Sequence, residues 1–136
     1  MKEPIILTFE LSRKQMISAN DRLHFQQKAK ITRFLRELAR YEGNNTLRDW
    51  YGLPFSEDKP CNVRVVIFSP TMRKYDPPNW SPTSKALLDG LTDAEFWTDD
   101  NYNIIKEVSF LHGGKSGTQN YKIKLEIMEI EIDVIE

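Results

Sequence analysis

Cys61-Asn-Val-Arg-Val-Val-Ile-Phe-Ser69 is a near-continuous apolar run in this sequence of 136 residues, and it decides how the rest is interpreted. The lack of alternation indicates a strand that is covered on both faces. The next segment, Arg73-Lys-Tyr-Asp-Pro-Pro-Asn-Trp80, holds two adjacent prolines, which exclude regular structure there. A helix is then expected from about Pro82 to Thr92, because proline suits the first turn of a helix.

On the amino-terminal side, alternating apolar residues predict a strand over residues 4–11. A helix is expected from about Asp21 to Tyr41, ended by the Gly43-Asn-Asn segment. Residues 44–60 are rich in Gly, Pro, Asn and Asp and predict an irregular loop. Its aromatic side chains are predicted to be exposed: Trp50, Tyr51 and Phe55.

On the carboxy-terminal side, Ile104 to Leu111 and Tyr121 to Ile132 are predicted to form the two arms of a hairpin, joined by His112-Gly-Gly-Lys-Ser-Gly117. The apolar phase of the last strand changes near Met128, which indicates a bulge or a break. The sequence therefore predicts an α+β fold in one domain spanning residues 1–136, with a mixed β-sheet and two helices in the order β-α-β-α-β-β.

Charge is unevenly distributed along the chain. The formal net charge is −1, with 19 basic and 20 acidic residues, which does not favour a general nucleic-acid coat. From Arg13 to Arg40, however, there are eight Lys or Arg residues against two acids. In the predicted first helix, one side is apolar (Leu23, Ile31, Phe34, Leu35, Leu38 and Tyr41) and the other is cationic (Arg22, Arg33, Arg36 and Arg40). Such a stripe can follow DNA phosphates, and a solvated helix face explains it equally well.

Cysteine content and the amino terminus bear on location. The one cysteine, Cys61, excludes an internal disulfide and a cysteine-based zinc site, and it favours a reducing cytoplasm. The first apolar run is too short for a signal segment or a membrane span. We therefore expect a cytoplasmic protein that does not associate with membranes.

Two other motifs carry little chemistry. Gly114-Lys115-Ser116 resembles the end of a phosphate-binding loop, but Ser109 stands where the first glycine of that motif belongs. The segment also lies between predicted strands, so a glycine hairpin is the better interpretation and no nucleotide cofactor is expected. His24 and His112 lie far apart and match no metal-ligand spacing, so surface or interface roles are expected for both.

Acidic residues follow the apolar strand and the second helix. Asp76 follows Cys61–Ser69, and Asp99 and Asp100 precede the next strand. Loops at one edge of a sheet can bring such carboxylates together, and Mg²⁺ prefers one or two of them with waters and a phosphate. Ordinary turn chemistry also explains aspartate at these positions. Lys85 and Asp89 have i,i+4 spacing, which predicts either a surface ion pair or a lysine facing the scissile phosphate.

Together these residues resemble a known family. Asp76-Pro-Pro-Asn79-Trp, Pro82-Thr-Ser-Lys85-Ala-Leu-Leu-Asp89-Gly-Leu and Phe96-Trp-Thr-Asp99-Asp100 look like the D-x-D-N…K-A…D-(G/A)-L…D-D signature of RusA-type Holliday-junction resolvases. Ser18-Ala-Asn20-Asp-Arg22 is similar to the S-x-N-x-R segment before that family's first helix. The resemblance covers about positions 5–130.

The resemblance implies a homodimeric, Mg²⁺-dependent endodeoxyribonuclease, with Mn²⁺ as an alternative ion, that nicks paired strands of a four-way DNA junction in recombination and repair. It implies that Asp76, Lys85 and Asp100 are catalytic, and that Asp76 and Asp100 hold the metal with Asp99 as a further candidate ligand. DNA contacts are expected from the residues so far singled out for charge or position: Asn20, Arg22, Arg33, Arg36, Arg40, Arg73, Lys74 and Asn79.

Pro78 departs from the family pattern, because it stands where the second aspartate is expected and proline cannot ligate a metal through its side chain. Asp99, Asp89 or Asn79 could substitute, or the site could hold one ion, or activity could be reduced. Two other functions therefore stay open. One is a DNA-structure-binding protein that does not cleave or cleaves weakly, and the other is a nuclease for other branched DNA.

Overall fold

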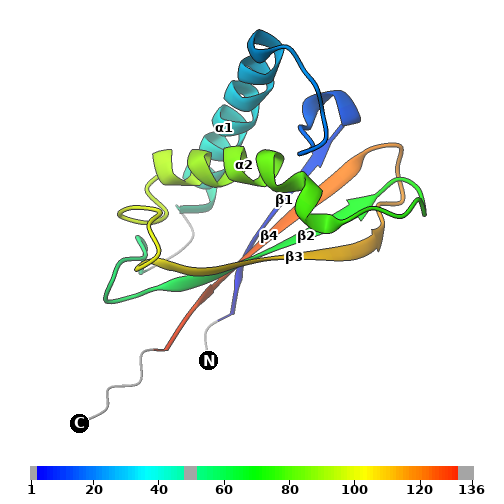
Figure 1. Cartoon of the computed structure of the whole chain (residues 1–136). Helices are drawn as coiled ribbons and strands as arrows, with labels where there is room; N and C mark the ends of the chain where they lie inside the picture. The colour runs from blue at the N-terminus through cyan, green and yellow to red at the C-terminus, as the bar shows by residue number, and fades with distance from the viewer. Residues whose placement is uncertain (1–2, 48–51, 132–136) are drawn as a thin grey trace.

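The computed structural model describes residues 3–47 and 52–131, and it has the predicted element order. Trp50, Tyr51 and Ile132 lie outside the described residues. The strands and helices, with two short 3₁₀ segments η1 and η2, are β1 (Ile5–Leu11), η1 (Arg13–Gln15), α1 (Phe25–Leu47), β2 (Cys61–Ser69), η2 (Pro77–Trp80), α2 (Ser81–Asp93), β3 (Ile105–Lys115) and β4 (Tyr121–Glu129) (Figure 1). The α+β prediction with a mixed sheet and two helices is confirmed.

The strand order is β1-β4-β2-β3. β4 pairs antiparallel with both β1 and β2, whereas β2 pairs parallel with β3. The predicted hairpin between β3 and β4 is therefore wrong, because β2 lies between them. Consecutive strands usually pair, but here the α2 crossover sets β3 parallel to β2, and the last strand fills the place between β1 and β2.

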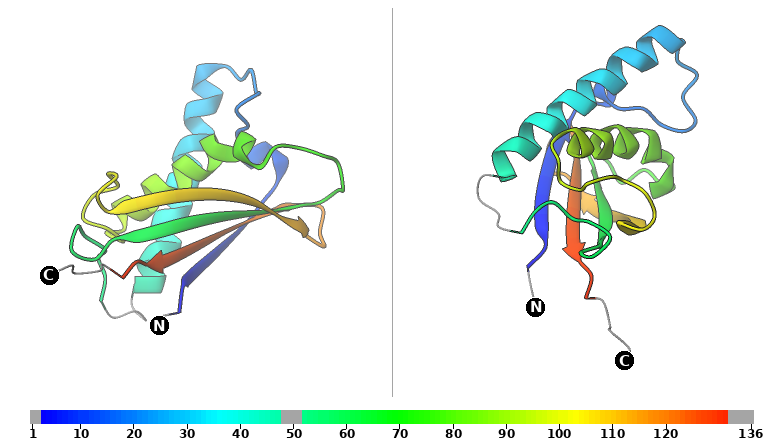
Figure 2. Two further views of the ribbon diagram at one scale, coloured as in Figure 1. Left: turned by 60° about the horizontal axis from the view of Figure 1, so that its bottom comes forward. Right: turned by 90° about the vertical axis from the view of Figure 1, so that its left-hand side faces the viewer.

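Both helices cover one face of the sheet (Figure 2). The odd-numbered side chains of β1 are buried, as the alternation predicted, and so are the three central odd-numbered side chains of β4, Ile123, Leu125 and Ile127. In β2, Val63, Val65 and Ile67 join the same core. The prediction that β2 is covered on both faces is wrong for the described residues. On the open face Val66 is nevertheless buried. Its side chain packs closely against Gly113, where an added Cβ would lie only 2.7 Å from Val66 Cγ1.

The crossing of α1 and α2 depends on two glycines. A Cβ on Gly90 would lie 2.3 Å from the backbone oxygen of Arg36, so α2 can approach the α1 backbone only without a side chain there. A Cβ on Gly43 would lie 2.9 Å from Ala94 Cβ. This packing explains why α1 does not end at Gly43-Asn-Asn as predicted but continues to Leu47. Gly43 is a packing position within the helix.

The first half of α1 differs from its second half. α1 begins at Phe25 and not near Asp21, whose carboxylate accepts a hydrogen bond from the Ser18 backbone N–H at 2.9 Å. Every side chain from Phe25 to Lys30 is exposed, and the first turns project beyond α2 (Figure 1). Leu35 and Ala39 are buried, whereas Phe34 and Tyr41, which were predicted to pack, are exposed.

Two irregular segments also differ from expectation. The Pro-Pro segment, expected to lack regular structure, forms the 3₁₀ turn η2, whose first residues are prolines. Phe55, expected to be exposed, is buried, and its backbone forms hydrogen bonds with the backbone of Phe96 and Thr98.

Among the described residues, no helix combines the length and apolar character that crossing a membrane requires.

Candidate active site

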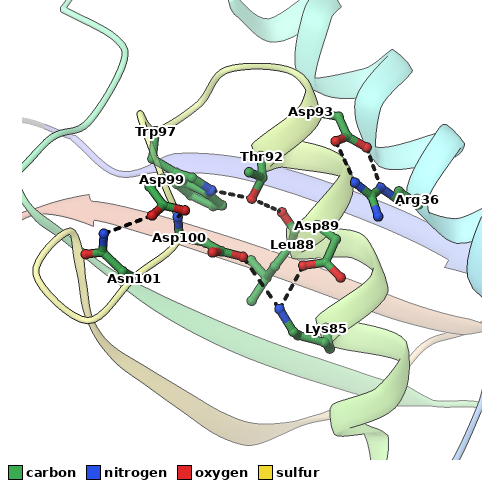
Figure 3. Close-up of polar contacts among 10 residues, drawn as sticks. All are labelled: Arg36, Lys85, Leu88, Asp89, Thr92, Asp93, Trp97, Asp99, Asp100 and Asn101. Carbon is green, nitrogen blue, oxygen red and sulfur yellow. Dashed lines mark hydrogen bonds and ion pairs between the residues drawn. The ribbon is translucent and has the colours of Figure 1, made fainter.

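Lys85, Asp89 and Asp100 come together on the exposed side of α2 (Figure 3). The Lys85 ammonium lies 2.8 Å from Asp89 Oδ1 and 3.5 Å from Asp100 Oδ2. Lys85 and Asp89 share one helix face, while Asp100 comes from the turn before β3. We refer to these three residues as the Lys85 cluster. The structure thus brings the predicted Lys85 and Asp100 together, and it contains the ion pair between Lys85 and Asp89 that the i,i+4 spacing predicted.

The turn that carries Asp100 is held against α2 by buried aromatic residues. Phe96 and Trp97 are almost completely buried. The Trp97 indole donates a 2.6 Å hydrogen bond to Thr92 Oγ1, which donates in turn to the Leu88 carbonyl on α2 (Figure 3). These contacts fix where the chain leaves the helix, so the following carboxylates lie beside α2 and not in open solvent.

Electrostatic interactions in the Lys85 cluster stabilise the charged form of Lys85. The hydrogen bond to Asp89 raises the pKa of Lys85 above its ordinary value, and the charges of Asp89 and Asp100 add to this, while partial burial opposes it. One ammonium faces two carboxylates, so a net negative charge remains. That balance favours a further cation at this position.

Asp99 points toward its own turn. Its carboxylate accepts hydrogen bonds from the Asn101 side-chain amide at 3.0 Å and the Asp100 backbone N–H at 2.8 Å. These bonds lower the pKa of Asp99, so it is a carboxylate at neutral pH. Asp99 is exposed next to the Lys85 cluster, in keeping with its predicted place beside Asp100.

Asp76 lines a cavity and, within the described part of the chain, makes no direct contact with the Lys85 cluster. It is the residue before η2 and lines an open cavity of 690 Å³ together with Arg73, Asn79 and His112. Among the described residues, no hydrogen bond or ion pair joins the Asp76 side chain to Lys85, Asp89 or Asp100. The structure therefore groups two of the three predicted catalytic residues by direct contact and leaves Asp76 on a neighbouring cavity.

His112 and Tyr75 form a contact in this cavity that the sequence did not predict. The Tyr75 Oη and His112 Nδ1 atoms lie 2.5 Å apart. Burial, with a smaller contribution from Tyr121, raises the pKa of Tyr75 to about 12, so the phenol keeps its proton at neutral pH. β3 extends to Lys115, which places His112 within the strand and beside the loop that carries Asp76.

The chemistry of the carboxylates suits Mg²⁺, although they do not form a complete ligand set. Mg²⁺ takes oxygen ligands and needs only one or two carboxylates, with waters and phosphate oxygens at the other positions. Within residues 3–47 and 52–131, no group of three or more His, Cys, Asp or Glu side chains could hold a metal ion. Asp89 and Asp100, which contact Lys85, and Asp99, the residue before Asp100, could each contribute oxygens.

The predicted DNA-binding residues fall into two places. Arg22, Arg33, Arg36 and Arg40 are exposed on or just before α1. Arg36 makes two hydrogen bonds to Asp93, at 2.5 and 2.8 Å, which lower the pKa of Asp93 and tie α1 to α2 (Figure 3). Its guanidinium is thus already occupied by a carboxylate.

The other predicted residues meet around one groove of 290 Å³, which we call the basic groove. It is lined by residues from the loop after β1 and from the loop between β2 and α2, among them Arg13, Asn20, Arg73, Lys74, Asn79 and Trp80. Arg13 and Trp80 were not singled out from the sequence. Only the tertiary contact between these loops brings Arg13 beside Asn79, and no local pattern signals it.

Comparison with known proteins adds no family assignment. No protein-family model matches this chain, and a search of curated protein sequences also gave no match.

Proposed function

We propose that this protein is a Mg²⁺-dependent endonuclease that resolves four-way DNA junctions by paired nicks, in the manner of RusA-type resolvases. The observation that carries the proposal is the contact of Lys85 with Asp100, two residues of the RusA-like signature that come from different elements. A lysine beside clustered carboxylates, next to a groove lined by cations, suits hydrolysis of a phosphodiester.

Each residue of the proposed site has a role. Asp100 would hold the ion, with Asp89, Asp76 and Asp99 as further candidate ligands, and Mg²⁺ bound there would supply an activated water and neutralise charge on the phosphate. The Lys85 ammonium donates a hydrogen bond to the phosphate and stabilises charge in the transition state. Asp89 orients Lys85 and, by raising the pKa of Lys85, keeps it protonated.

Asp89 is our candidate to compensate for Pro78. Pro78 offers no ligand, whereas Asp89 Oδ1 and Asp100 Oδ2 both lie within 3.5 Å of the Lys85 ammonium. Two carboxylates that already face one cation are well placed to share a second one. Asp89, which lies on α2, thus takes the place of the second aspartate that is missing at position 78 in η2.

The junction substrate and the dimer are part of the same proposal. Two identical sites related by a two-fold axis can act on the two equivalent strands of a junction. A dimer has twice the 16.0 kDa mass of one chain, which light scattering coupled to gel filtration measures directly.

The deciding experiment is cleavage of a synthetic four-way junction in Mg²⁺ under single-turnover conditions, with flap and linear duplex substrates beside it. Wild type is expected to make symmetric nicks in the junction and to cut linear duplex at least tenfold more slowly. Asp100→Asn and Asp76→Asn are expected to reduce the rate by roughly a hundredfold or more. Asp58→Asn serves as the control, because Asp58 is an exposed acid in the short turn closed by the bridge between Ser56 and Lys59. Wild-type rates in both Asp100→Asn and Asp76→Asn would show that the site is assigned wrongly.

The second candidate function is binding of branched DNA without cleavage. The proline at position 78, together with the lack of direct contact between Asp76 and the Lys85 cluster, favours it. The same assay separates the two functions, because junction binding in Mg²⁺ with no nicking of any substrate would support the second candidate. Preferred cleavage of the flap would instead indicate a nuclease for other branched DNA.

A further inference from the structure

The basic groove is built by two segments that lie far apart in the sequence. The Ile17 backbone N–H donates to Thr83 Oγ1 at 2.8 Å, and the same hydroxyl donates back to the Ile17 carbonyl, also at 2.8 Å. Thr83 is completely buried. The Ala19 N–H donates a 2.7 Å bond to the Asn79 carbonyl. The loop after β1 is therefore fixed against the start of α2, and the groove between them is part of the folded framework.

The groove carries cations in two different states. Arg13 is held by three contacts: its guanidinium lies 2.7 Å from Asp21 Oδ1, donates to the Met16 carbonyl at 3.3 Å, and stacks 4.9 Å above the Trp80 ring. Arg73 and Lys74 form no ion pair with any residue in the described part of the chain, and both side chains are exposed. The residues that line the groove include no acid. Positive charge is thus concentrated in the groove and only partly neutralised.

Trp80 provides an independent observation. It lines the groove but is only 6% exposed, and its indole Nε1 has no hydrogen-bond partner among residues 3–47 and 52–131. The other described tryptophan, Trp97, donates its indole N–H to Thr92. A buried donor without an acceptor is unfavourable unless a ligand or water supplies one. Because Trp80 lines the groove, a ligand bound there would change the surroundings of this indole.

We propose that the basic groove binds one phosphate group of a DNA strand, separate from the phosphate that is cleaved. The assignment of this phosphate to a DNA strand rests on the proposed function, whereas the choice of a phosphate rests on the residues of the groove alone. A guanidinium presents a planar fork of donors that matches phosphate oxygens, and here it is held in place before a ligand arrives. Asn20 and Asn79 add amide donors at the rim.

The choice of phosphate follows from the number and kind of donors. Two arginines, a lysine and two asparagine amides offer more donors than the two oxygens of one carboxylate can accept. The volume of 290 Å³ admits a phosphate with part of its sugar and is too small for a section of duplex. The groove therefore holds one point of a strand and fixes its position relative to the Lys85 cluster.

The first test is a two-dimensional NMR titration of the ¹⁵N-labelled wild-type protein without Mg²⁺, observing the tryptophan indole signals. Inorganic phosphate and a single-stranded DNA tetranucleotide are added separately, with sodium chloride at matched ionic strength as the control. The Trp80 indole signal is expected to shift with both phosphate probes and not with chloride, and the tetranucleotide should act at a concentration at least tenfold lower. The Trp97 indole signal should stay in place.

Substitutions identify the groove as the binding site. Arg13→Gln and Arg73→Gln are each expected to raise the Kd of the tetranucleotide about tenfold and to lower the salt dependence of binding by about one charge. Arg64→Gln is the matched control, because Arg64 lies on the open sheet face and pairs with Glu126 there. Arg73 has no ion-pair partner in the described residues, so its variant remains informative even if Arg13→Gln fails to fold.

The outcomes separate this inference from the proposed function. No shift of the Trp80 signal with either probe, or equal Kd values for Arg73→Gln and Arg64→Gln, overturns the groove as a phosphate site even if the protein cleaves junctions. A shift with inorganic phosphate but not with the tetranucleotide overturns the assignment to a DNA strand. If both probes bind as expected but wild type cleaves no branched DNA, the groove stands and the endonuclease proposal fails.

Discussion

The basic groove lies at the start of α2 and the Lys85 cluster lies beside the middle of the same helix, and they differ in how their charges are satisfied. In the Lys85 cluster, the ammonium contacts carboxylates of the same chain, and one negative charge is left over. In the groove, Arg73 and Lys74 have no such partner among the described residues, and a buried indole N–H is unpaired. The first arrangement suits a divalent cation and the second suits an anion. Together they match the two components of a metal-dependent reaction on a phosphodiester.

If the Lys85 cluster binds the metal and the groove binds the strand, the cluster governs the cleavage rate, and the largest effect on that rate is expected there. Lys85→Ala should reduce single-turnover cleavage of a four-way junction in Mg²⁺ by about a hundredfold to a thousandfold, because a fixed charge facing the phosphate is lost. Stability should change little, since the Lys85 side chain is 66% exposed. Lys106→Ala on β3, also an exposed lysine, is the control. A cleavage rate within threefold of wild type would remove Lys85 from the reaction.

The close crossing of α1 and α2 fixes the position of α2, the helix that carries Lys85 and Asp89. Gly90→Ala places a Cβ against the Arg36 carbonyl, so we expect a loss of about 2–4 kcal/mol in the free energy of unfolding, measured by urea denaturation. Gly43→Ala should cost clearly less, because its shortest contact, 2.9 Å to Ala94 Cβ, is less severe than the 2.3 Å contact of Gly90 with a backbone oxygen, and because alanine favours the helix. Equal stability of the two variants would show that the crossing is looser than described.

A smaller effect is expected from the Arg36–Asp93 pair, which ties the same two helices together. Because Arg36 lowers the pKa of Asp93 below 3.8, the interaction contributes at pH values above about 4 and is lost as pH falls through the lowered value. Asp93→Asn should cost about 0.5 kcal/mol at neutral pH, since the pair is partly exposed, and progressively less as the pH falls through the lowered pKa of Asp93. The measurement is urea unfolding from pH 2 to 7.

Glu37→Gln on the exposed side of α1 is the control for this series. Its difference from wild type is expected to stay flat over the same pH range. If the two variants followed one pH profile, the dependence would reflect overall charge and not the Asp93 pair.

Sequence and structure agree where local patterns decide the outcome. The apolar run Cys61–Ser69 correctly predicted β2, Pro82 and the spacing of apolar residues after it predicted α2, and the i,i+4 spacing predicted the contact between Lys85 and Asp89. Strand order could not be predicted in this way, because β3 and β4 look like a hairpin locally and only the complete sheet places β2 between them. The predicted end of α1 at Gly43 was wrong for the same reason, since Gly43 allows a close contact with Ala94 after α2, and a local pattern does not reveal such a contact.

The same division applies to the candidate sites. The signature residues Lys85 and Asp100 were predicted together, and the aromatic anchors Phe96 and Trp97 between them explain why they meet. Asp76 carries the same sequence signal, but its position on a separate cavity depends on how η2 leads into α2. Arg13 had no sequence signal beyond its charge. Its role in the groove arises from the hydrogen bonds of Ile17 and Ala19 to distant residues.

The most direct test measures junction Kd and single-turnover cleavage rate side by side for wild type, Asp100→Asn and Arg73→Gln. We predict that wild type nicks the junction in Mg²⁺, that Asp100→Asn binds normally but cleaves at least a hundredfold more slowly, and that Arg73→Gln binds about tenfold more weakly but cleaves at a normal rate once saturated. Failure of the wild type to nick the junction, or a loss of binding in Asp100→Asn that equals its loss of rate, would contradict the account.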